Sequence, residues 1–147
     1  MPEGVAVVSR VGGRLRAALE SQGRRVRCLV RRPEFLRGRV GDETEVVQGD
    51  VLDPASLTTP LAGCDAAYYL VHAMCSGEDF SSADRATALA FAEGAQGIRQ
   101  VVYLGGILPA SSGGEHSAHL RSRAEVGEIL RSRLPTTEVR AGPIIGS

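Results

Sequence analysis

Short apolar runs alternate along the whole chain with segments that have helical periodicity or helix-capping residues. Six runs are rich in β-branched and other apolar residues and have the length of one buried strand. They cover residues 5–8, 26–30, 45–47, 66–71, 100–104 and 137–141. Parallel strands need crossover connections, and the segments between the runs can supply them. The pattern predicts an α/β fold: a doubly wound parallel sheet in a three-layer α/β/α arrangement.

Helix-start signals support this interpretation at three places. Asp53 is a good N-cap and Pro54 suits the first helical position, so a short helix is expected to follow them. Ser81 begins a pattern like a capping box, and apolar residues then recur at helical spacing. Ser117 can cap a last helix that runs to about residue 133.

The first junction between strand and helix, within residues 5–19, has the form of a phosphate-binding corner. Gly12 and Gly13 stand where the strand ends and the helix begins. Glycines there let the backbone approach a pyrophosphate, and the N–H groups and dipole of the helix start favour an anion. The dinucleotide fingerprint has three spaced glycines, however, and this pair is incomplete. The corner is either a phosphate site or only a packing turn.

Length and composition fit one domain, residues 1–147, because 43% of the residues are hydrophobic and can form a core. The formal net charge is zero, but ten of the 17 basic residues lie in the first forty positions, and all 17 are arginine. These arginines form either a basic rim around a phosphate ligand or an ordinary solvated surface. Nucleic acid is not expected as a partner, because no aromatic residues are interleaved with them.

Cysteine and histidine spacing disfavours other kinds of site. Cys28, Cys64 and Cys75 are odd in number and lack CxxC spacing, which suggests no disulfide framework or zinc site and fits the cytoplasm. His116 and His119 form an HxxH motif, but no third ligand has suitable spacing, so no metal is expected. No signal-peptide pattern is present, and no apolar run reaches the ~18 residues of a membrane span, so no membrane partner is expected.

Several segments together carry a resemblance to a known family. They read RVRCLVRRPEFL, VVQGDVLDPASL, DAAYYLVHAM, VVYLGGILP, HLRSRAEVGEILR and TEVRAGPIIGS. In combination they resemble the atypical, NmrA-like branch of the extended short-chain dehydrogenases/reductases, which are NAD(P)-binding Rossmann proteins often described as nucleoside-diphosphate-sugar epimerase-like. The resemblance covers nearly the whole chain. It implies a Rossmann-like fold, a dinucleotide cofactor, and an oxidoreductase or epimerase-like activity on an unknown small molecule.

Two departures from the family pattern bear on function. The first turn of the family reads Thr-Gly-x-x-Gly-x-x-Gly, and this chain is about four residues shorter there. Relatives also continue beyond the equivalent of Ser147 into further sheet and most of the substrate pocket. The chain is therefore expected to be a fragment or a truncated form after the sixth strand. A non-catalytic module that binds or senses the dinucleotide, or a remnant without activity, is the alternative to an enzyme.

The resemblance implies cofactor contacts at nine positions. Seven of them would contact the pyrophosphate, the adenine and the nicotinamide-side ribose, in chain order: Gly12 and Gly13; Asp50 and Val51; Val71, His72 and Ala73. Arg31 and Arg32 follow the second predicted strand, where an NAD enzyme has an acidic residue that reads the ribose hydroxyls. Arginine suits a 2′-phosphate, so NADP is expected in preference to NAD. Without the resemblance, Val51 and Val71 are more simply core residues.

The usual catalytic residues of such reductases are missing. Those enzymes use Tyr as proton donor, Lys to lower the pKa of the Tyr, and Ser to polarise the carbonyl. This chain has no lysine, and Gly105 and Gly106 stand where the Ser is expected. HLRSR takes the place of the Tyr-x-x-x-Lys motif, so His119 and Arg123 become the candidate catalytic residues, with His119 as proton donor and Arg123 as its electrostatic partner.

Helical spacing continues the row of His119 and Arg123 through Val126 and Leu130. The spacing predicts that all four side chains share the face packed towards the sheet. The alternative is a histidine at a helix N-terminus with an ion-pairing arginine, a purely structural pair.

Overall fold

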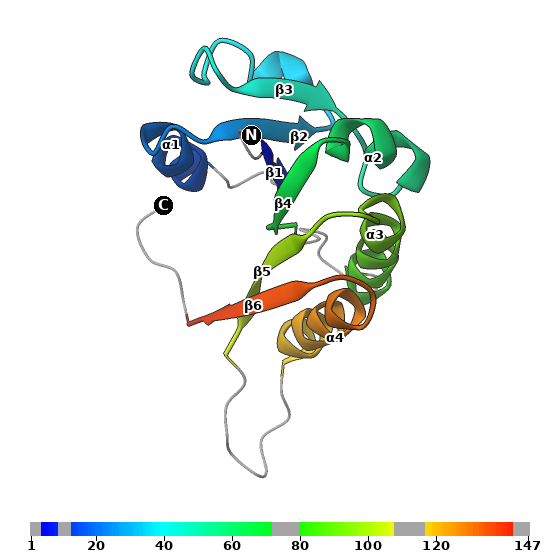
Figure 1. Ribbon diagram of the computed structural model, residues 1–147. Helices are drawn as coiled ribbons and strands as arrows, with labels where there is room; N and C mark the ends of the chain where they lie inside the picture. Colours follow the sequence, from blue (N-terminus) through cyan, green and yellow to red (C-terminus); the bar gives the residue numbers. More distant parts are fainter. Residues whose placement is uncertain (1–3, 9–12, 72–79, 108–116, 143–147) are drawn as a thin grey trace.

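Six parallel strands form one sheet in the computed structural model, which describes residues 4–8, 13–71, 80–107 and 117–142 (Figure 1). The strands are β1 (Gly4–Val8), β2 (Arg25–Val30), β3 (Glu45–Gln48), β4 (Cys64–Tyr69), β5 (Gln100–Gly106) and β6 (Thr136–Ala141). Their order across the sheet is β3-β2-β1-β4-β5-β6. The chain therefore reverses its direction of winding between β1 and β4, the switch point at which open α/β sheets bind ligands.

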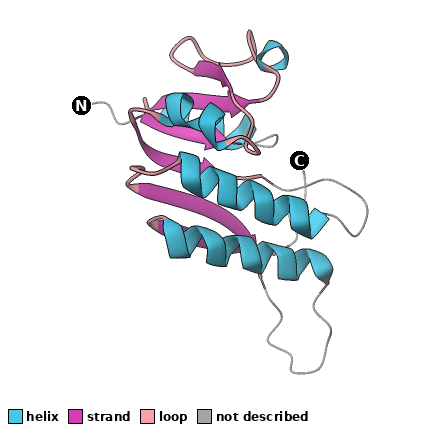
Figure 2. Cartoon of the chain, turned by 90° about the vertical axis from the view of Figure 1, so that its right-hand side faces the viewer, coloured by secondary structure: helices cyan, strands magenta, loops and turns pink. Residues whose placement is uncertain are grey.

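Helices cover both faces of this sheet. They are α1 (Gly13–Ser21), the short 3₁₀ helix η1 (Pro33–Phe35), α2 (Pro54–Leu61), α3 (Phe80–Gly94) and α4 (Ala118–Arg133). In Figure 1, α2, α3 and α4 lie on one side of the sheet and α1 on the other, and Figure 2 shows α3 and α4 side by side. The predicted three-layer, doubly wound parallel sheet is confirmed.

Two of the predicted helix caps are confirmed. Asp53 accepts a hydrogen bond from the amide of Ala55 (3.1 Å), and Ser117 accepts one from the amide of Leu120 (3.3 Å). Each satisfies one N–H group that the first turn of a helix otherwise leaves without a partner. The prediction for Ser81 is wrong, because this residue lies inside the first turn of α3.

The fourth strand begins two residues earlier than predicted. β4 runs from Cys64 to Tyr69, whereas the apolar run indicated 66–71. Cys64 pairs with Gly4 of β1, and a register irregularity follows between Gly4 and Val5. Pairing with β1 therefore determines where β4 starts, although the early position 65 is an aspartate with low strand propensity.

The main core lies between the sheet and α2, α3 and α4. Tyr69, Phe91 and Tyr103 are almost completely buried there, with ring centroids 4.8 Å apart for Tyr69–Phe91 and 6.0 Å for Tyr69–Tyr103. A smaller cluster of Leu19, Val26 and Cys28 lies under α1. Burial of these apolar side chains is the dominant favourable term that holds the layers together.

Gly94 allows α3 to approach the start of α2 closely. A Cβ atom at this position would lie 2.7 Å from the Cβ of Leu57 and 2.9 Å from the carbonyl oxygen of Pro54. We expect Gly94→Ala to lower the free energy of unfolding by about 1–3 kcal/mol, because a fixed backbone atom blocks the methyl group. Urea unfolding measures the change. Gly13→Ala is the control, since nothing lies within 4 Å of its new methyl group, and an equal loss in both variants would contradict the prediction.

Candidate functional site

Most of the sequence-predicted site residues that the structure describes lie at the carboxyl ends of the strands. Arg31 is the first residue after β2, Asp50 is the second residue after β3, and Val71 is the second residue after β4. Arg123, on α4, lies beside Gly106 at the end of β5. Because the strands are parallel, these ends share one edge of the sheet, where ligands of this fold class bind.

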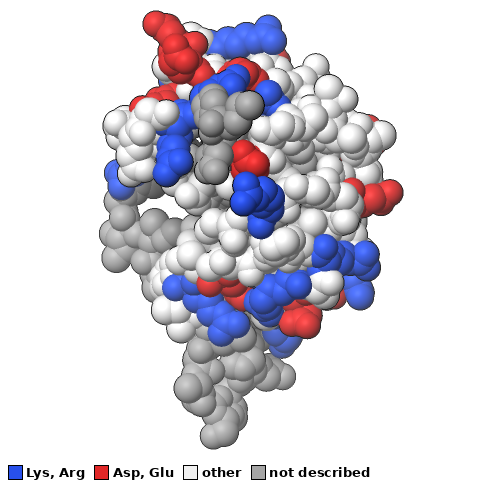
Figure 3. Space-filling view, viewed as in Figure 1, with Lys and Arg blue, Asp and Glu red and all other residues white. Residues whose placement is uncertain are grey.

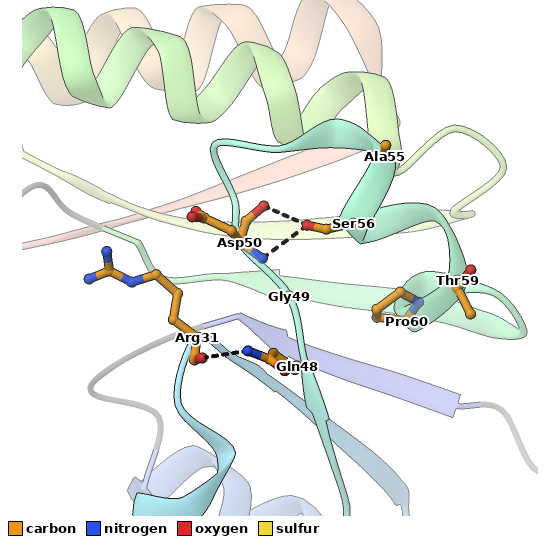
Figure 4. Close-up of a pocket in the computed structure, with 8 residues that line it drawn as sticks. All are labelled: Arg31, Gln48, Gly49, Asp50, Ala55, Ser56, Thr59 and Pro60. Atoms are coloured by element: carbon orange, nitrogen blue, oxygen red, sulfur yellow. Dashed lines mark hydrogen bonds between the residues drawn. The ribbon is translucent and has the colours of Figure 1, made fainter.

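A pocket of about 530 Å³ lies at this edge, next to the ends of β2 and β3 (Figure 4). It is lined by Arg31, Gln48, Gly49, Asp50, Ala55, Ser56, Thr59 and Pro60. The lining combines one cationic and one anionic side chain with small and hydroxylated residues. Such a set can hold a ligand that carries both hydrogen-bonding groups and negative charge.

Ser56 fixes the backbone that carries Asp50. The amide of Asp50 donates to Ser56 Oγ (3.0 Å), and the single proton of that hydroxyl can be donated to the carbonyl of Asp53 (2.8 Å) or of Asp50 (3.0 Å). Asp50 Oδ1 in turn accepts from the amide of Leu52 (3.0 Å). The turn after β3 is therefore tied to the first turn of α2, which holds the half-buried Asp50 side chain in the pocket wall (Figure 4).

Gly49 has no room for a side chain. A Cβ atom there would lie 2.7 Å from Cδ1 of Leu29 on β2 and 3.4 Å from the carbonyl oxygen of Ser56. The chain thus crosses directly over Leu29 as it leaves β3. This close approach of the backbone favours glycine at a position that also lines the pocket.

Arg31 extends from the end of β2 toward the same pocket. Gln48 Nε2 donates to the backbone carbonyl of Arg31 (3.3 Å), which ties the end of β2 to the end of β3. The Arg31 side chain is exposed, and within the described part of the chain no carboxylate forms a salt bridge with it. Arg32 is held differently, because its guanidinium lies 5.9 Å from the centre of the Phe35 ring.

The phosphate-binding corner is described only on its helix side. Gly13 is the first residue of α1, is exposed, and has open space around the position of a Cβ atom. Gly12, His72 and Ala73 lie outside the described residues. Val51 and Val71 are half-buried and pack against the main core, so both positions have a structural role whether or not a ligand binds.

The prediction that His119 and Arg123 share the buried face of α4 is wrong for His119. Val126 and Leu130 are buried and Arg123 is half-buried, but His119 is exposed and stacks on Phe80, with ring centroids 4.2 Å apart. His119 lies in the first turn of α4, on the second residue of the helix.

Arg123 is held at the strand ends by its surroundings. A Cβ atom added at Gly106 would lie 3.5 Å from Cδ of Arg123. The glycine therefore leaves room for the arginine side chain. The hydroxyl of Tyr103 donates to the backbone carbonyl of Arg123 (3.0 Å). Burial raises the pKa of Tyr103, which keeps the phenol neutral and makes it a structural donor.

Sequence reasoning missed the polar contact that joins α3 to α4 near this point. Ser122 Oγ donates to Oδ2 of Asp84 (2.9 Å), and both residues are buried. A serine and an aspartate near helix starts resemble caps in a sequence, so nothing in their spacing indicates an interhelical pair. The contact connects the N-terminal halves of α3 and α4.

The described residues offer no metal site and no reactive thiol. No group of three or more His, Cys, Asp or Glu side chains among them is arranged to hold a metal ion. Cys28 and Cys64 are free and buried, and burial raises the pKa of both thiols. No helix of the described part is both long and apolar enough to cross a membrane.

The fold and the pocket together define a class, a dinucleotide-binding α/β domain. The strand order, the switch point between β1 and β4 and the pocket at the strand ends are its defining features. Residues 8–136 match a family model described as NAD(P)H-binding. This match spans most of the chain, so the protein belongs to that NAD(P)H-binding family.

Solved structures with the same fold include several that contain such cofactors. Triphenylmethane reductase of Citrobacter sp. is 19% identical with a TM-score of 0.75, and the match covers 93% of this chain and 48% of that one; that reductase has also been solved with NADP(H). A short-chain dehydrogenase/reductase superfamily protein of Agrobacterium tumefaciens with bound NAD is 21% identical (TM-score 0.73; 94% and 48% covered). WbmH of Bordetella bronchiseptica, in complex with NAD+, is 14% identical (TM-score 0.74; 95% and 56% covered).

These likenesses show the fold. The chain spans about half the length of the solved proteins that it matches. Among curated proteins, none matches the sequence significantly.

The pocket combines an acceptor, a cation and a residue without a side chain. Asp50 supplies a carboxylate acceptor, Gly49 a surface without a side chain, and Arg31 a cation that forms no salt bridge to a described carboxylate. A purine amino group needs an acceptor of that kind, and a phosphate needs a guanidinium. The family match indicates a nicotinamide adenine dinucleotide as the cofactor.

Proposed function

We propose that this domain binds NADP(H) in preference to NAD(H), with the adenosine 2′-phosphate on Arg31 and the adenine beside Asp50 and Val51. The observation that carries the proposal is Arg31, an exposed residue that lines the pocket and forms no salt bridge to any described carboxylate. A guanidinium binds phosphate through two parallel hydrogen bonds, whereas the ribose hydroxyls of NAD are better matched by a carboxylate acceptor. Arg32 lies next to it and assists.

The pyrophosphate is assigned to the start of α1. Helix α1 has no acidic residue in its first turn, and Gly13 is exposed with open space around the position of a Cβ atom. The N–H groups of that first turn and the helix dipole attract an anion. In this proposal the dinucleotide runs along the strand ends from Arg31 towards Val71. The nicotinamide-side ribose is assigned to Val71, His72 and Ala73.

For the chemistry, we propose the NmrA-like branch of the extended reductases and an oxidoreductase or epimerase-like reaction, in which the bound cofactor supplies or accepts hydride. Arg123 supports this, because it lies beside Gly106 at the ligand end of β5. His119 would donate the proton from the exposed first turn of α4.

The competing proposal is a module that binds or senses the dinucleotide without catalysis, and the absence of lysine favours it. A cytoplasmic location suits both, because Cys28 and Cys64 are free thiols.

The binding proposal is tested by titrating the purified chain with NADPH and with NADH in a calorimeter. We expect saturable binding of NADPH at one site and weaker binding of NADH. Failure of both cofactors to bind would overturn the proposal.

The catalytic proposal needs a separate measurement. In a form of the protein that oxidises NADPH with a carbonyl substrate, we expect His119→Gln to lower kcat by roughly 10² or more and to leave NADPH affinity unchanged, the usual contribution of a general acid. The Gln retains the length of a polar side chain but cannot transfer a proton at neutral pH. An unchanged kcat would leave the binding module as the better description.

A further inference from the structure

Gln48, the last residue of β3, lies beside Arg31 in the wall of the pocket (Figure 4). Its Nε2 atom donates to the backbone carbonyl of Arg31 (3.3 Å). The next residue adds a second bond, because the amide of Gly49 donates to the carbonyl of Val30 (3.1 Å). The carbonyls of two consecutive residues where β2 ends are therefore held by two consecutive residues where β3 ends.

The hydrogen bond from Gln48 restricts the direction in which Arg31 leaves the chain. The carbonyl of Arg31 belongs to the planar peptide group that follows its Cα atom, so holding that group restricts ψ of Arg31. Pro33, two residues further on, is buried, and its ring fixes its own φ. The backbone of Arg31 thus lies between two fixed points. Because the side chain itself is exposed and rich in rotamers, this backbone is the part of the arginine that the fold holds in place.

Surface charge alone does not provide such a direction. The formal net charge of the chain is zero, and basic and acidic side chains are intermixed on the face that Figure 3 shows. A uniformly positive surface would attract any phosphate, whereas this surface does not favour a ligand with one additional phosphate. Selection of a single phosphate therefore depends on a particular cation held in a particular orientation.

We propose that Gln48 is a positioning residue that sets the preference for the 2′-phosphate by acting through the backbone of Arg31. This inference rests on the proposed function, in which Arg31 binds that phosphate. An arginine side chain loses conformational entropy when it becomes ordered on a ligand, and a pre-organised site loses less of it. A guanidinium also needs a defined orientation to make two parallel hydrogen bonds to a phosphate. NADH has no 2′-phosphate, so its affinity does not depend on this orientation.

Gln48→Met tests the proposal, because methionine has a similar length and no donor. We expect the affinity for NADPH to fall by roughly 3- to 10-fold, the contribution of one ordinary hydrogen bond, and the affinity for NADH to stay unchanged. Calorimetric titration with each cofactor at one ionic strength gives the ratio of the two dissociation constants. A merely structural role would not change this ratio, because a loosened pocket weakens both cofactors.

Gln96→Met is the matched control. The Nε2 atom of Gln96 donates to the backbone carbonyl of Ala92 (2.7 Å), and Gln96 is exposed like Gln48 but does not line the pocket. The control therefore removes the same kind of hydrogen bond at a distant place, and we expect both cofactors to bind it as they bind the parent. Circular dichroism confirms that each variant is folded.

A double-mutant cycle separates positioning from direct contact with the ligand. In the Arg31→Ala background, Gln48→Met should leave the affinity for NADPH unchanged, because Gln48 acts only through the arginine. A preference for NADPH that survives Arg31→Ala would overturn the proposed function. If Arg31→Ala erases the preference, the inference about Gln48 alone is overturned by either of two results. The first is an unchanged ratio in Gln48→Met, and the second is an effect of Gln48→Met that persists without the arginine.

Discussion

Arg31→Asp should erase or reverse the preference of the domain for NADPH over NADH. The wild-type guanidinium would make charge-assisted hydrogen bonds to the 2′-phosphate, each worth about 1.5–3 kcal/mol. Their loss weakens NADPH binding by roughly 10- to 100-fold, since 1.4 kcal/mol is a factor of ten. The new carboxylate repels the phosphate and can accept hydrogen bonds from the ribose hydroxyls of NADH. Dissociation constants of both cofactors, measured for both proteins at one ionic strength, give the change in preference.

Two further variants separate this effect from a general change in charge. Arg37→Asp makes the same change of charge in the same loop, but Arg37 does not line the pocket. The preference of this variant for NADPH over NADH should therefore match that of the parent. Arg32→Ala should have a smaller effect than Arg31→Asp, because Arg32 lies over Phe35. Equal dissociation constants for NADPH and NADH in the parent chain would show that Arg31 does not read the 2′-phosphate.

The fold could be predicted because local and long-range signals agree. Apolar runs of strand length, separated by capped helical segments, have few arrangements open to them, and the right-handed parallel crossover selects the doubly wound sheet. The starts of α2 and α4 were predictable from Asp53 and Ser117 alone, since a cap is a local interaction. The start of β4 was not, because it depends on pairing with β1 across 60 residues.

Less of the candidate site could be predicted. Periodicity gives the direction in which a helical side chain points, but not whether anything lies beneath it. His119 lies on the first turn of α4, where its side chain is exposed and stacks on Phe80 of α3. Arg123, one turn later, reaches the end of β5. The spacing of the pair could not distinguish these two situations.

The supports of the pocket are also invisible in the sequence. Ser56 forms hydrogen bonds with the backbone of Asp50, and Gln48 forms one with the backbone of Arg31. Gly49 packs closely against Leu29. Each of these contacts joins two segments that come together only when the sheet has folded, so the sequence does not reveal it. The candidate ligand-binding residues could be named from a resemblance, but the residues that position them could not.

The largest change in stability is expected from a substitution in the core between α3 and the strands β4 and β5. Phe91 is completely buried, and its ring lies 4.8 Å from that of Tyr69 at an angle of 52°. Phe91→Ala should lower the free energy of unfolding by about 3–5 kcal/mol, through lost burial and the cavity left behind. That is a large part of the roughly 5–15 kcal/mol that stabilises a typical domain. Urea unfolding followed by circular dichroism measures the loss.

Phe35→Ala provides the matched comparison, because it removes the same atoms from a ring that is 63% exposed. Its effect should stay below about 1 kcal/mol, since little apolar area returns to water and the contact with Arg32 is a weak cation–π interaction. A similar loss in both variants would mean that the packing of α3 on the sheet is not the main source of stability. A loss confined to Phe91→Ala would show that the packing of α3 on β4 and β5 is a main source of the stability of the domain.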